Sequence, residues 1–152
     1  MTLHVAIEDA ASADAQTLMA ELSAVLATLT GASGQASFDP ADVRVARACF
    51  AVARDAHGRA LGCGALRPLE PDSAEIKRMF ARPGSHGVGA AVLRFLEQEA
   101  ARFGYAAARL STRRVNERAV AFYERHGYRR IEGYGRYAGS DVSVCFEKVL
   151  AP

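Results

Sequence analysis

Residues 74–103 read AEIKRMFARPGSHGVGAAVLRFLEQEAARF, and this stretch decides the fold. The run 75–81 predicts a strand, in which apolar and polar residues are mixed until Pro83 and Gly84 interrupt the pattern. From residue 88 to 103, apolar residues recur at the spacing of a helix with one buried face. Gly104 follows where a helix end favours positive φ. The stretch therefore predicts a strand, a glycine loop and a helix in succession.

The glycine loop is GSHGVG, residues 84–89. A loop of this kind exposes unpaired N–H groups at the positive end of the helix dipole, which predicts an anion site, most often for phosphate. The dinucleotide motif G-x-G-x-x-G is only half met, because Val92 stands at the third glycine position. The phosphate loop G-x-x-x-x-G-K-[ST] fails, because no Lys-Ser or Lys-Thr follows. A plain connection between strand and helix remains an alternative for the loop alone.

The 152 residues suit one compact domain, 1–152, and half of them are hydrophobic, enough for a core. A formal net charge of +2 gives no argument for nucleic acid or membrane binding. No apolar run is long enough to span a bilayer, and the first ten residues lack the pattern of a secretory signal. Cys49, Cys63 and Cys145 lie in apolar runs without metal-type spacing, which favours buried free thiols and a cytoplasmic protein.

The rest of the chain alternates between strands and helices. Strands are expected at 3–8, 47–54, 60–66, 106–111, 128–131 and 141–150, and helices at 13–29 and 113–126. Ser12 and Asn116 are candidate N-caps, and Gly31 and Gly127 are candidate helix ends. Residues 30–45 form an irregular loop with one helical turn at most, and turns are expected at 55–58 and 68–73. The pattern predicts a mixed, mostly antiparallel seven-stranded sheet with helices, in which the crossover through 88–103 joins parallel strands.

Three segments, together with this order of elements, resemble the GNAT superfamily of N-acetyltransferases, of the small bacterial single-domain type. They are EIKRMFARPGSHGVG at 75–89, NERAVAFYERHGYRRI at 116–131 and YAGSDVSVCFEK at 137–148. The resemblance covers residues 3–149. Two departures concern the loop, which looks shorter than usual and has Gly84 where the family has Gln or Arg.

The resemblance implies an α/β enzyme that moves an acetyl group from acetyl-CoA to a primary amine of a small molecule or peptide, directly and without a metal. It carries a set of cofactor-binding residues over to this chain. These are Met79, Phe80, Ala81, Gly84, Ser85, His86, Gly87, Val88, Gly89, Ala90, Asn116, Ala119 and Phe122. Asn116 could be a simple N-cap, a ligand of the pantetheine arm, or both.

Two residues are candidates for the proton transfers. Tyr123 matches the tyrosine that the family places near the thioester sulfur, and a phenol can donate a proton to a thiolate. Glu75 matches a glutamate that deprotonates the amine directly or through water. Each has a structural alternative, since Tyr123 could be a core tyrosine and Glu75 could pair with Lys77 or a neighbour. A covalent route through Cys63 is disfavoured by its small, apolar surroundings.

The partners implied are acetyl-CoA and an amine acceptor, with neither nucleic acid nor membrane. Small members of the family often pair through their C-terminal strands, so a homodimer is an open option. A non-catalytic acyl-CoA-binding module is the main alternative, although such a module need not keep both Tyr123 and Glu75. The acceptor has no recognisable motif, and an aminoglycoside, a polyamine, an amino acid and a protein amine all stay open.

Overall fold

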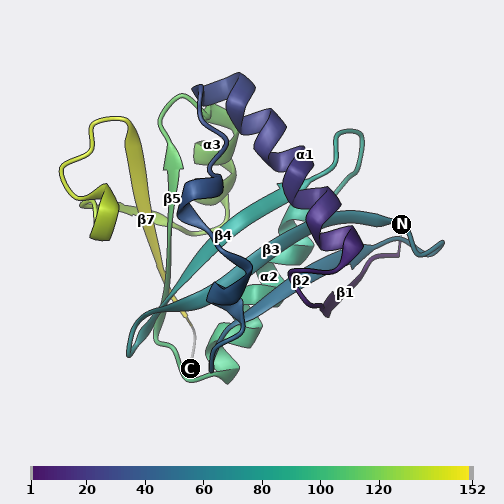
Figure 1. The fold of residues 1–152 in the computed structure, drawn as a ribbon. Coiled ribbons are helices and arrows are strands. Elements are labelled where there is room, and N and C mark those ends of the chain that lie inside the picture. Colours follow the sequence, from purple (N-terminus) through teal and green to yellow (C-terminus); the bar gives the residue numbers. More distant parts are fainter. Residues whose placement is uncertain (1, 151–152) are drawn as a thin grey trace.

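The computed structural model describes residues 2–150 (Figure 1). Seven strands form one sheet in the order β1-β2-β3-β4-β5-β7-β6. The strands are β1 (His4–Ile7), β2 (Cys49–Arg54), β3 (Ala60–Glu70), β4 (Ser73–Ala81), β5 (Ala107–Arg113), β6 (Arg129–Ile131) and β7 (Ser143–Val149). The α-helices are α1 (Ala13–Thr30), α2 (Val88–Arg102) and α3 (Glu117–Arg125). Only β4 and β5 pair in parallel among these strands, which confirms the predicted mixed sheet.

The sheet separates two apolar layers. On one face, Leu18 and Leu22 of α1 pack with Phe50 and Phe80 of the sheet. On the other face lie α2 and α3, behind the sheet in the view of Figure 1. The second layer contains Val92 and Leu96 of α2 with side chains from β3, β4, β5 and β7. Because both faces are covered, the central strands read as apolar on both sides and not as a strict alternation.

The helix ends follow the caps predicted from the sequence. Ser12 Oγ accepts a hydrogen bond from the Ala15 N–H at 3.1 Å, and Gly31 ends α1 with φ of 79°. Asn116 Oδ1 accepts from the Ala119 N–H at 3.3 Å, which confirms it as the N-cap of α3. The expected start of that helix at residue 113 is wrong, because Arg113 still pairs with β7 and its carbonyl accepts from the Asn116 N–H.

Two other boundaries differ from the prediction. β3 continues to Glu70, so the expected strand end at residue 66 and turn over 68–73 are wrong. Pro68 is tolerated within the pairing because the register of β3 and β4 shifts just beyond it. The loop 30–45 contains two 3-10 turns, Gln35–Ser37 and Pro40–Val43, where one helical turn at most was expected.

A β-bulge in β4 sets the direction of the side chains around the cleft described below. Cys63 pairs with Phe80 and Ala65 pairs with Lys77, so Arg78 and Met79 together oppose Gly64. Arg78 has a φ of 55°, an unusual value for a residue with a Cβ. As a result Arg78 follows Lys77 on the α1 side of the sheet, where its guanidinium donates to the Met19 carbonyl at 2.9 Å and to Ser23 Oγ at 2.6 Å.

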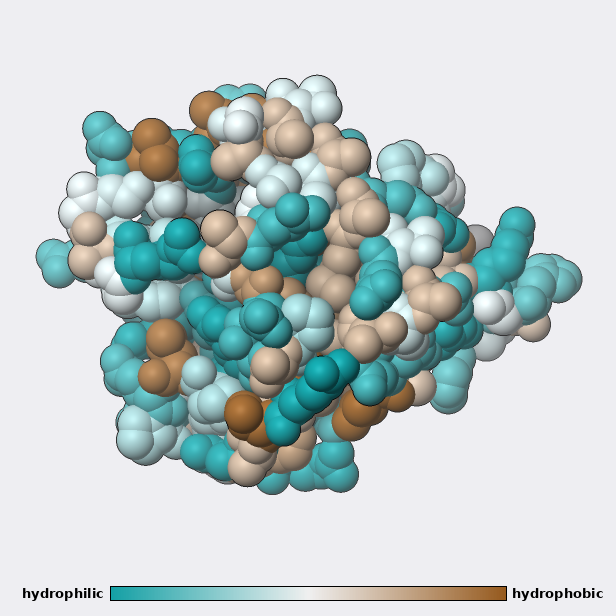
Figure 2. Space-filling view, in the orientation of Figure 1, coloured by the Kyte–Doolittle hydropathy of each residue, from teal (hydrophilic) through white to brown (hydrophobic). Residues whose placement is uncertain are grey.

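The surface on the α1 side mixes polar and apolar residues. In Figure 2, which has the orientation of Figure 1, the strongly hydrophobic residues are scattered among hydrophilic ones. Scattered apolar residues are usual on a folded protein and mark no interface by themselves. Within residues 2–150, no helix is both long and apolar enough to cross a membrane.

Candidate active site

A cleft opens where β4 and β5 separate. The two strands pair only from Ser73–Ala107 to Glu75–Arg109, although β4 continues to Ala81 and β5 to Arg113. Figure 1 shows them side by side at one end of the sheet and diverging toward the other end. The unpaired part of the β4 edge therefore faces a gap about 150 Å³ in volume that side chains from both layers line.

The cleft brings together some of the residues predicted for the site. Glu75 and Met79 reach it from β4, and Asn116, Ala119 and Tyr123 reach it from α3 and its N-cap. Lys77, Ser111, Thr112 and Tyr137 line it as well. Phe80 and Ala81 do not line it, because the Phe80 side chain is buried under α1 and Ala81 pairs with Gly62 on the far side of β4.

Tyr123 presents an unused hydroxyl to this cleft. The residue is 8% exposed, and its ring packs edge-on against Tyr128, with centroids 5.7 Å apart. Within residues 2–150 its hydroxyl forms no hydrogen bond, whereas the neighbouring Tyr128 hydroxyl donates to Glu97 at 2.8 Å. Burial raises the pKa of Tyr123 well above that of a free phenol, so the hydroxyl is protonated at neutral pH. The arrangement suits a proton donor.

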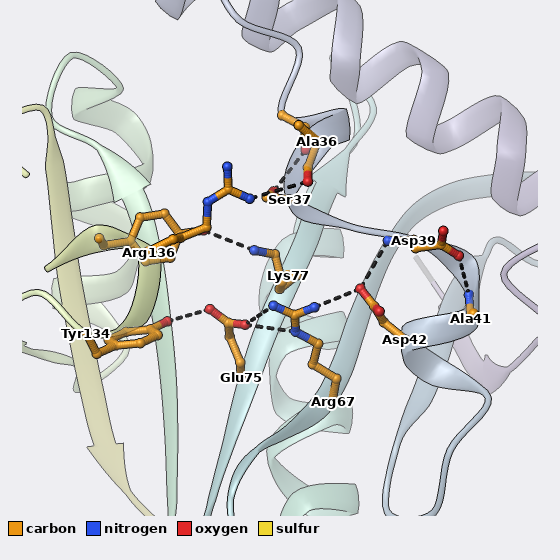
Figure 3. A network of polar contacts seen from close by, with 12 residues as sticks. Ala36, Ser37, Asp39, Ala41, Asp42, Arg67, Glu75, Lys77, Tyr134 and Arg136 are labelled. Carbon is orange, nitrogen blue, oxygen red and sulfur yellow. Dashed lines mark hydrogen bonds and ion pairs between the residues drawn. The ribbon is translucent and has the colours of Figure 1, made fainter.

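Glu75 is held by two partners at the edge of the cleft (Figure 3). It is 2% exposed, and Arg67 donates to Oε1 from both Nε, at 2.9 Å, and Nη2, at 2.8 Å. The Tyr134 hydroxyl donates to Oε2 at 2.7 Å. Burial and the negative charge of Glu75 raise the pKa of Tyr134, which keeps that phenol protonated. A proton acceptor at this place would therefore work through a water or after one of these bonds opens.

Loops from opposite sides of the cleft meet through the same network (Figure 3). Arg67 also pairs with Asp42, at 2.7 Å between Nη1 and Oδ2, which ties the turn Pro40–Val43 to β3. Lys77 Nζ donates to the Tyr137 hydroxyl at 3.0 Å. Arg136 Nη1 donates to the Ala36 carbonyl at 3.3 Å, which joins the loop before β7 to the turn Gln35–Ser37.

The residues of this network other than Glu75 are not indicated by the sequence alone. No motif in the sequence points to Arg67, Tyr134 or Tyr137. Of the two pairings expected for Glu75, with Lys77 or with a neighbour, the structure has the second, with Arg67 on the adjacent strand. The missed signal was the cross-strand register of Arg67 and Glu75, which required knowing that β3 extends past residue 66.

The loop before α2 presents a row of free backbone donors. Gly87 is the N-cap with φ of 73°, and the first intrahelical bond runs from the Ala91 N–H to the Gly87 carbonyl at 3.0 Å. Within the described part of the chain, none of the N–H groups from residue 86 to 90 donates a hydrogen bond. The Ser85 side chain is turned toward the preceding residues, because its hydroxyl donates to the Arg82 carbonyl at 2.6 Å. His86 is exposed. The row is available to an anion.

The first turn of α2 lies beside α3. A Cβ added at Gly89 would come within 3.4 Å of the Phe122 ring, so these two elements approach closely here. The Val88 side chain holds this turn against β3, where it packs so closely on Gly62 that a Cβ added there would lie 2.4 Å from Val88 Cγ1. Because Tyr123 follows Phe122 on α3, the donor row lies next to the helix that carries Tyr123.

The remaining chemistry of the region concerns metals and thiols. Among the described residues no group of three or more His, Cys, Asp or Glu side chains could hold a metal ion. Cys63 is buried under α1, where its thiol contacts the Arg78 carbonyl at 3.4 Å, and burial raises its pKa to about 12. It does not line the cleft.

Sequence and structure comparisons place this chain in a known class. Residues 16–128 match the model of the acetyltransferase (GNAT) family. The match covers more than half of the chain, and the open mixed sheet, the glycine loop at a helix start and the parted strands are those expected for that fold. The chain belongs to the GNAT family of acetyltransferases, and the predicted resemblance is confirmed.

Individual relatives agree with this assignment. An uncharacterized N-acetyltransferase of Schizosaccharomyces pombe is 40% identical over 86 residues, which are 55% of this chain and 53% of that protein. The chain thus matches about half the length of that relative. An IAA acetyltransferase of Azospirillum brasilense is 34% identical over 66% of this chain and 67% of its own. A structure described as an acyl-CoA N-acyltransferase from Klebsiella pneumoniae is 26% identical and superimposes with a TM-score of 0.83 over 99% of both chains.

Proposed function

We propose that this protein transfers an acetyl group from acetyl-CoA to a primary amine by direct attack in a ternary complex. The observation that carries the proposal is the free Tyr123 hydroxyl on α3, the helix that lies against the unpaired N–H row of residues 86–90. A site that must bind a phosphate-bearing thioester and then protonate its sulfur needs both features close together.

The donor row is proposed to bind the pyrophosphate of acetyl-CoA. Its five N–H groups and the α2 dipole supply positive potential without a charged side chain, which fits a loop that has Gly84 in place of Gln or Arg. The pantetheine arm would then run along the unpaired edge of β4, past the backbone at Met79–Ala81 and the first turn of α3. The side-chain oxygen of Asn116 accepts the helix-cap bond, and its amide N–H groups remain for the arm.

The chemistry follows from where the charges develop. The amine nitrogen attacks the thioester carbonyl carbon, a C–N bond forms, and the C–S bond breaks with its electron pair going to sulfur. The Tyr123 hydroxyl gives its proton to that sulfur, and backbone N–H groups beside Met79 stabilise the oxyanion. Glu75 is proposed to accept the amine proton through a water, because both of its oxygens already accept hydrogen bonds.

Thiol release during turnover tests the proposal. The full chain is mixed with acetyl-CoA and a panel of amines, free CoA is followed with a thiol reagent, and the acetylated amine is identified by mass spectrometry. Equal amounts of CoA and acetylated amine are the expected result. Tight acetyl-CoA binding without turnover on any amine would instead indicate a non-catalytic acyl-CoA-binding module. A cytoplasmic location and a homodimer stay predictions, checked by cell fractionation and by sedimentation.

A further inference from the structure

One of the two lysines of this chain is buried without a counter-ion. Lys148 pairs with Glu97 at 3.1 Å. Lys77 is 9% exposed, lines the cleft, and within residues 2–150 has no carboxylate within 4.0 Å. Its single hydrogen bond goes to the Tyr137 hydroxyl, at 3.0 Å. An ammonium group carries three donors, so two of them stay unused in the cleft.

The charged groups around Lys77 do not balance the positive charge of its ammonium group. Glu75 lies two residues away on the same strand face, but its oxygens are bound to Arg67 and Tyr134. Asp42 is bound to Arg67 as well. Arg78 also lines the cleft, and the groups that it contacts are the neutral oxygens of Met19, Ser23 and Ser33. The cleft therefore has an excess of positive charge.

A buried cation without a counter-ion is unfavourable, and an anion in the cleft would compensate the positive charge of Lys77. Acetyl-CoA does not supply that anion. Its phosphates are proposed to lie at the N–H row of residues 86–90, and the thioester end that would enter the cleft is neutral. The other molecule that must enter is the acceptor.

Resting on the function proposed above, we infer that the acceptor is a small amine that carries a carboxylate, as an amino acid does. The carboxylate would bind Lys77 Nζ and the Tyr137 hydroxyl. Because the Tyr137 oxygen accepts from Lys77, its own proton remains free to donate to the same carboxylate. The cleft has a volume of about 150 Å³, which suits a small acceptor.

The loop that precedes β7 keeps Lys77 and Tyr137 in position. Tyr137 packs edge-on against Tyr134, with centroids 5.6 Å apart, and Tyr134 is fixed by Glu75. Arg136 crosses to the Ala36 carbonyl on the opposite loop. The Glu75–Tyr134 bond thus orients the Tyr137 side of the acceptor site and links it to the proposed base.

Matched acceptors test the inference. We would measure kcat/KM for L-alanine, L-leucine and β-alanine against their carboxamides, which keep the amine and lose the negative charge. Each carboxylate is expected to be preferred by at least ten-fold. Lys77→Met should lower that preference by about ten- to a hundred-fold, the scale of one hydrogen bond to a charged group. Lys148→Met, which removes the other lysine, should keep it.

Binding gives a second readout that needs no turnover. N-acetyl-L-alanine and its carboxamide are titrated by calorimetry into the complex with CoA, and only the carboxylate should bind, in a manner that Lys77→Met abolishes. Carboxamides accepted as well as carboxylates, or a preference unchanged in Lys77→Met, would overturn the inference and leave the acetyltransferase proposal standing. If no amine is acetylated, that proposal fails, and the calorimetry alone decides whether the cleft binds a carboxylate.

Discussion

Arg67 and Glu75 face each other across β3 and β4, and Arg67 Nη2 lies 2.8 Å from Glu75 Oε1. With the Tyr134 hydroxyl on the other oxygen at 2.7 Å, the carboxylate is fixed in a place where it is 2% exposed. An ion pair this buried is costly to break by removing one partner. The strand pairing therefore holds Glu75, the proposed base, in one orientation. A water in the cleft can donate only to the lone pairs of Glu75 that Arg67 and Tyr134 leave free.

We expect Glu75→Gln to lower kcat by roughly a hundred- to ten-thousand-fold, the range for losing a general base. Glutamine keeps the shape and can still accept from Arg67, so the fold should persist. The measurement is kcat at saturating acetyl-CoA and amine, with thermal unfolding as the check on folding. Glu97→Gln, which removes a carboxylate outside the cleft, should leave kcat unchanged. A kcat equal to that of the wild type in folded Glu75→Gln would assign Glu75 a purely structural role.

Tyr123→Phe should lower kcat by about ten- to a thousand-fold while the affinity for acetyl-CoA stays nearly constant, because only the proton donor is lost. Tyr128→Phe is the matched control, since that hydroxyl donates to Glu97 and lies outside the cleft. The loss should shrink with a thioester whose thiol is more acidic. Full turnover in a folded Tyr123→Phe protein would show that the residue serves packing and that the acid lies elsewhere.

Burial gives Tyr123 a second measurable property. Its raised pKa means that the acid form persists to higher pH than in a free phenol, so the tyrosine adds no basic limb to the profile up to about pH 9. Ultraviolet difference spectra of the wild type and Tyr123→Phe between pH 7 and 10 measure the ionisation directly. A tyrosinate signal in this range that disappears with Tyr123→Phe would contradict the expected protonation state.

Gly89→Val should weaken acetyl-CoA binding by at least ten-fold. The branched side chain would press on the Phe122 ring, which a bare Cβ already approaches within 3.4 Å, and so would displace the donor row relative to α3. Calorimetry measures the affinity, and thermal unfolding shows whether the variant folds. Gly89→Ala should have a smaller effect, because its Cβ only reaches ordinary contact. An unchanged affinity in folded Gly89→Val would exclude this loop as the cofactor site.

Cys63 should form no acetyl-enzyme. With a pKa of about 12, the thiolate fraction at pH 8 is on the order of one in ten thousand, and the residue does not line the cleft. Mass spectrometry of the protein after acetyl-CoA alone should show the unmodified mass, and iodoacetamide should leave Cys63 unlabelled in the native state. A stoichiometric acetyl adduct on Cys63 would replace direct transfer by a two-step route.

Local signals in the sequence determined the elements and the family. The apolar spacing of residues 88–103, the caps Ser12 and Asn116, and the glycines at 31 and 127 each act within a few residues of chain, so they can be recognised without the fold. The same holds for the glycine loop and for Tyr123 within its helix motif. The strand that passes through Pro68 was missed because tertiary pairing outweighed the local turn signal.

Only the tertiary structure decided what surrounds the cleft. Glu75 meets Arg67 and Tyr134 because strand register and a distant loop bring them together, and no spacing in the sequence encodes that contact. Nothing in the sequence around Lys77 distinguishes it from other charged residues in strands. In the fold it is buried next to the bulge at Arg78, and it contacts Tyr137 from a distant loop. Burial without a counter-ion depends on contacts between residues far apart in the chain, and this is why the proposed acceptor site can be recognised only in the folded protein.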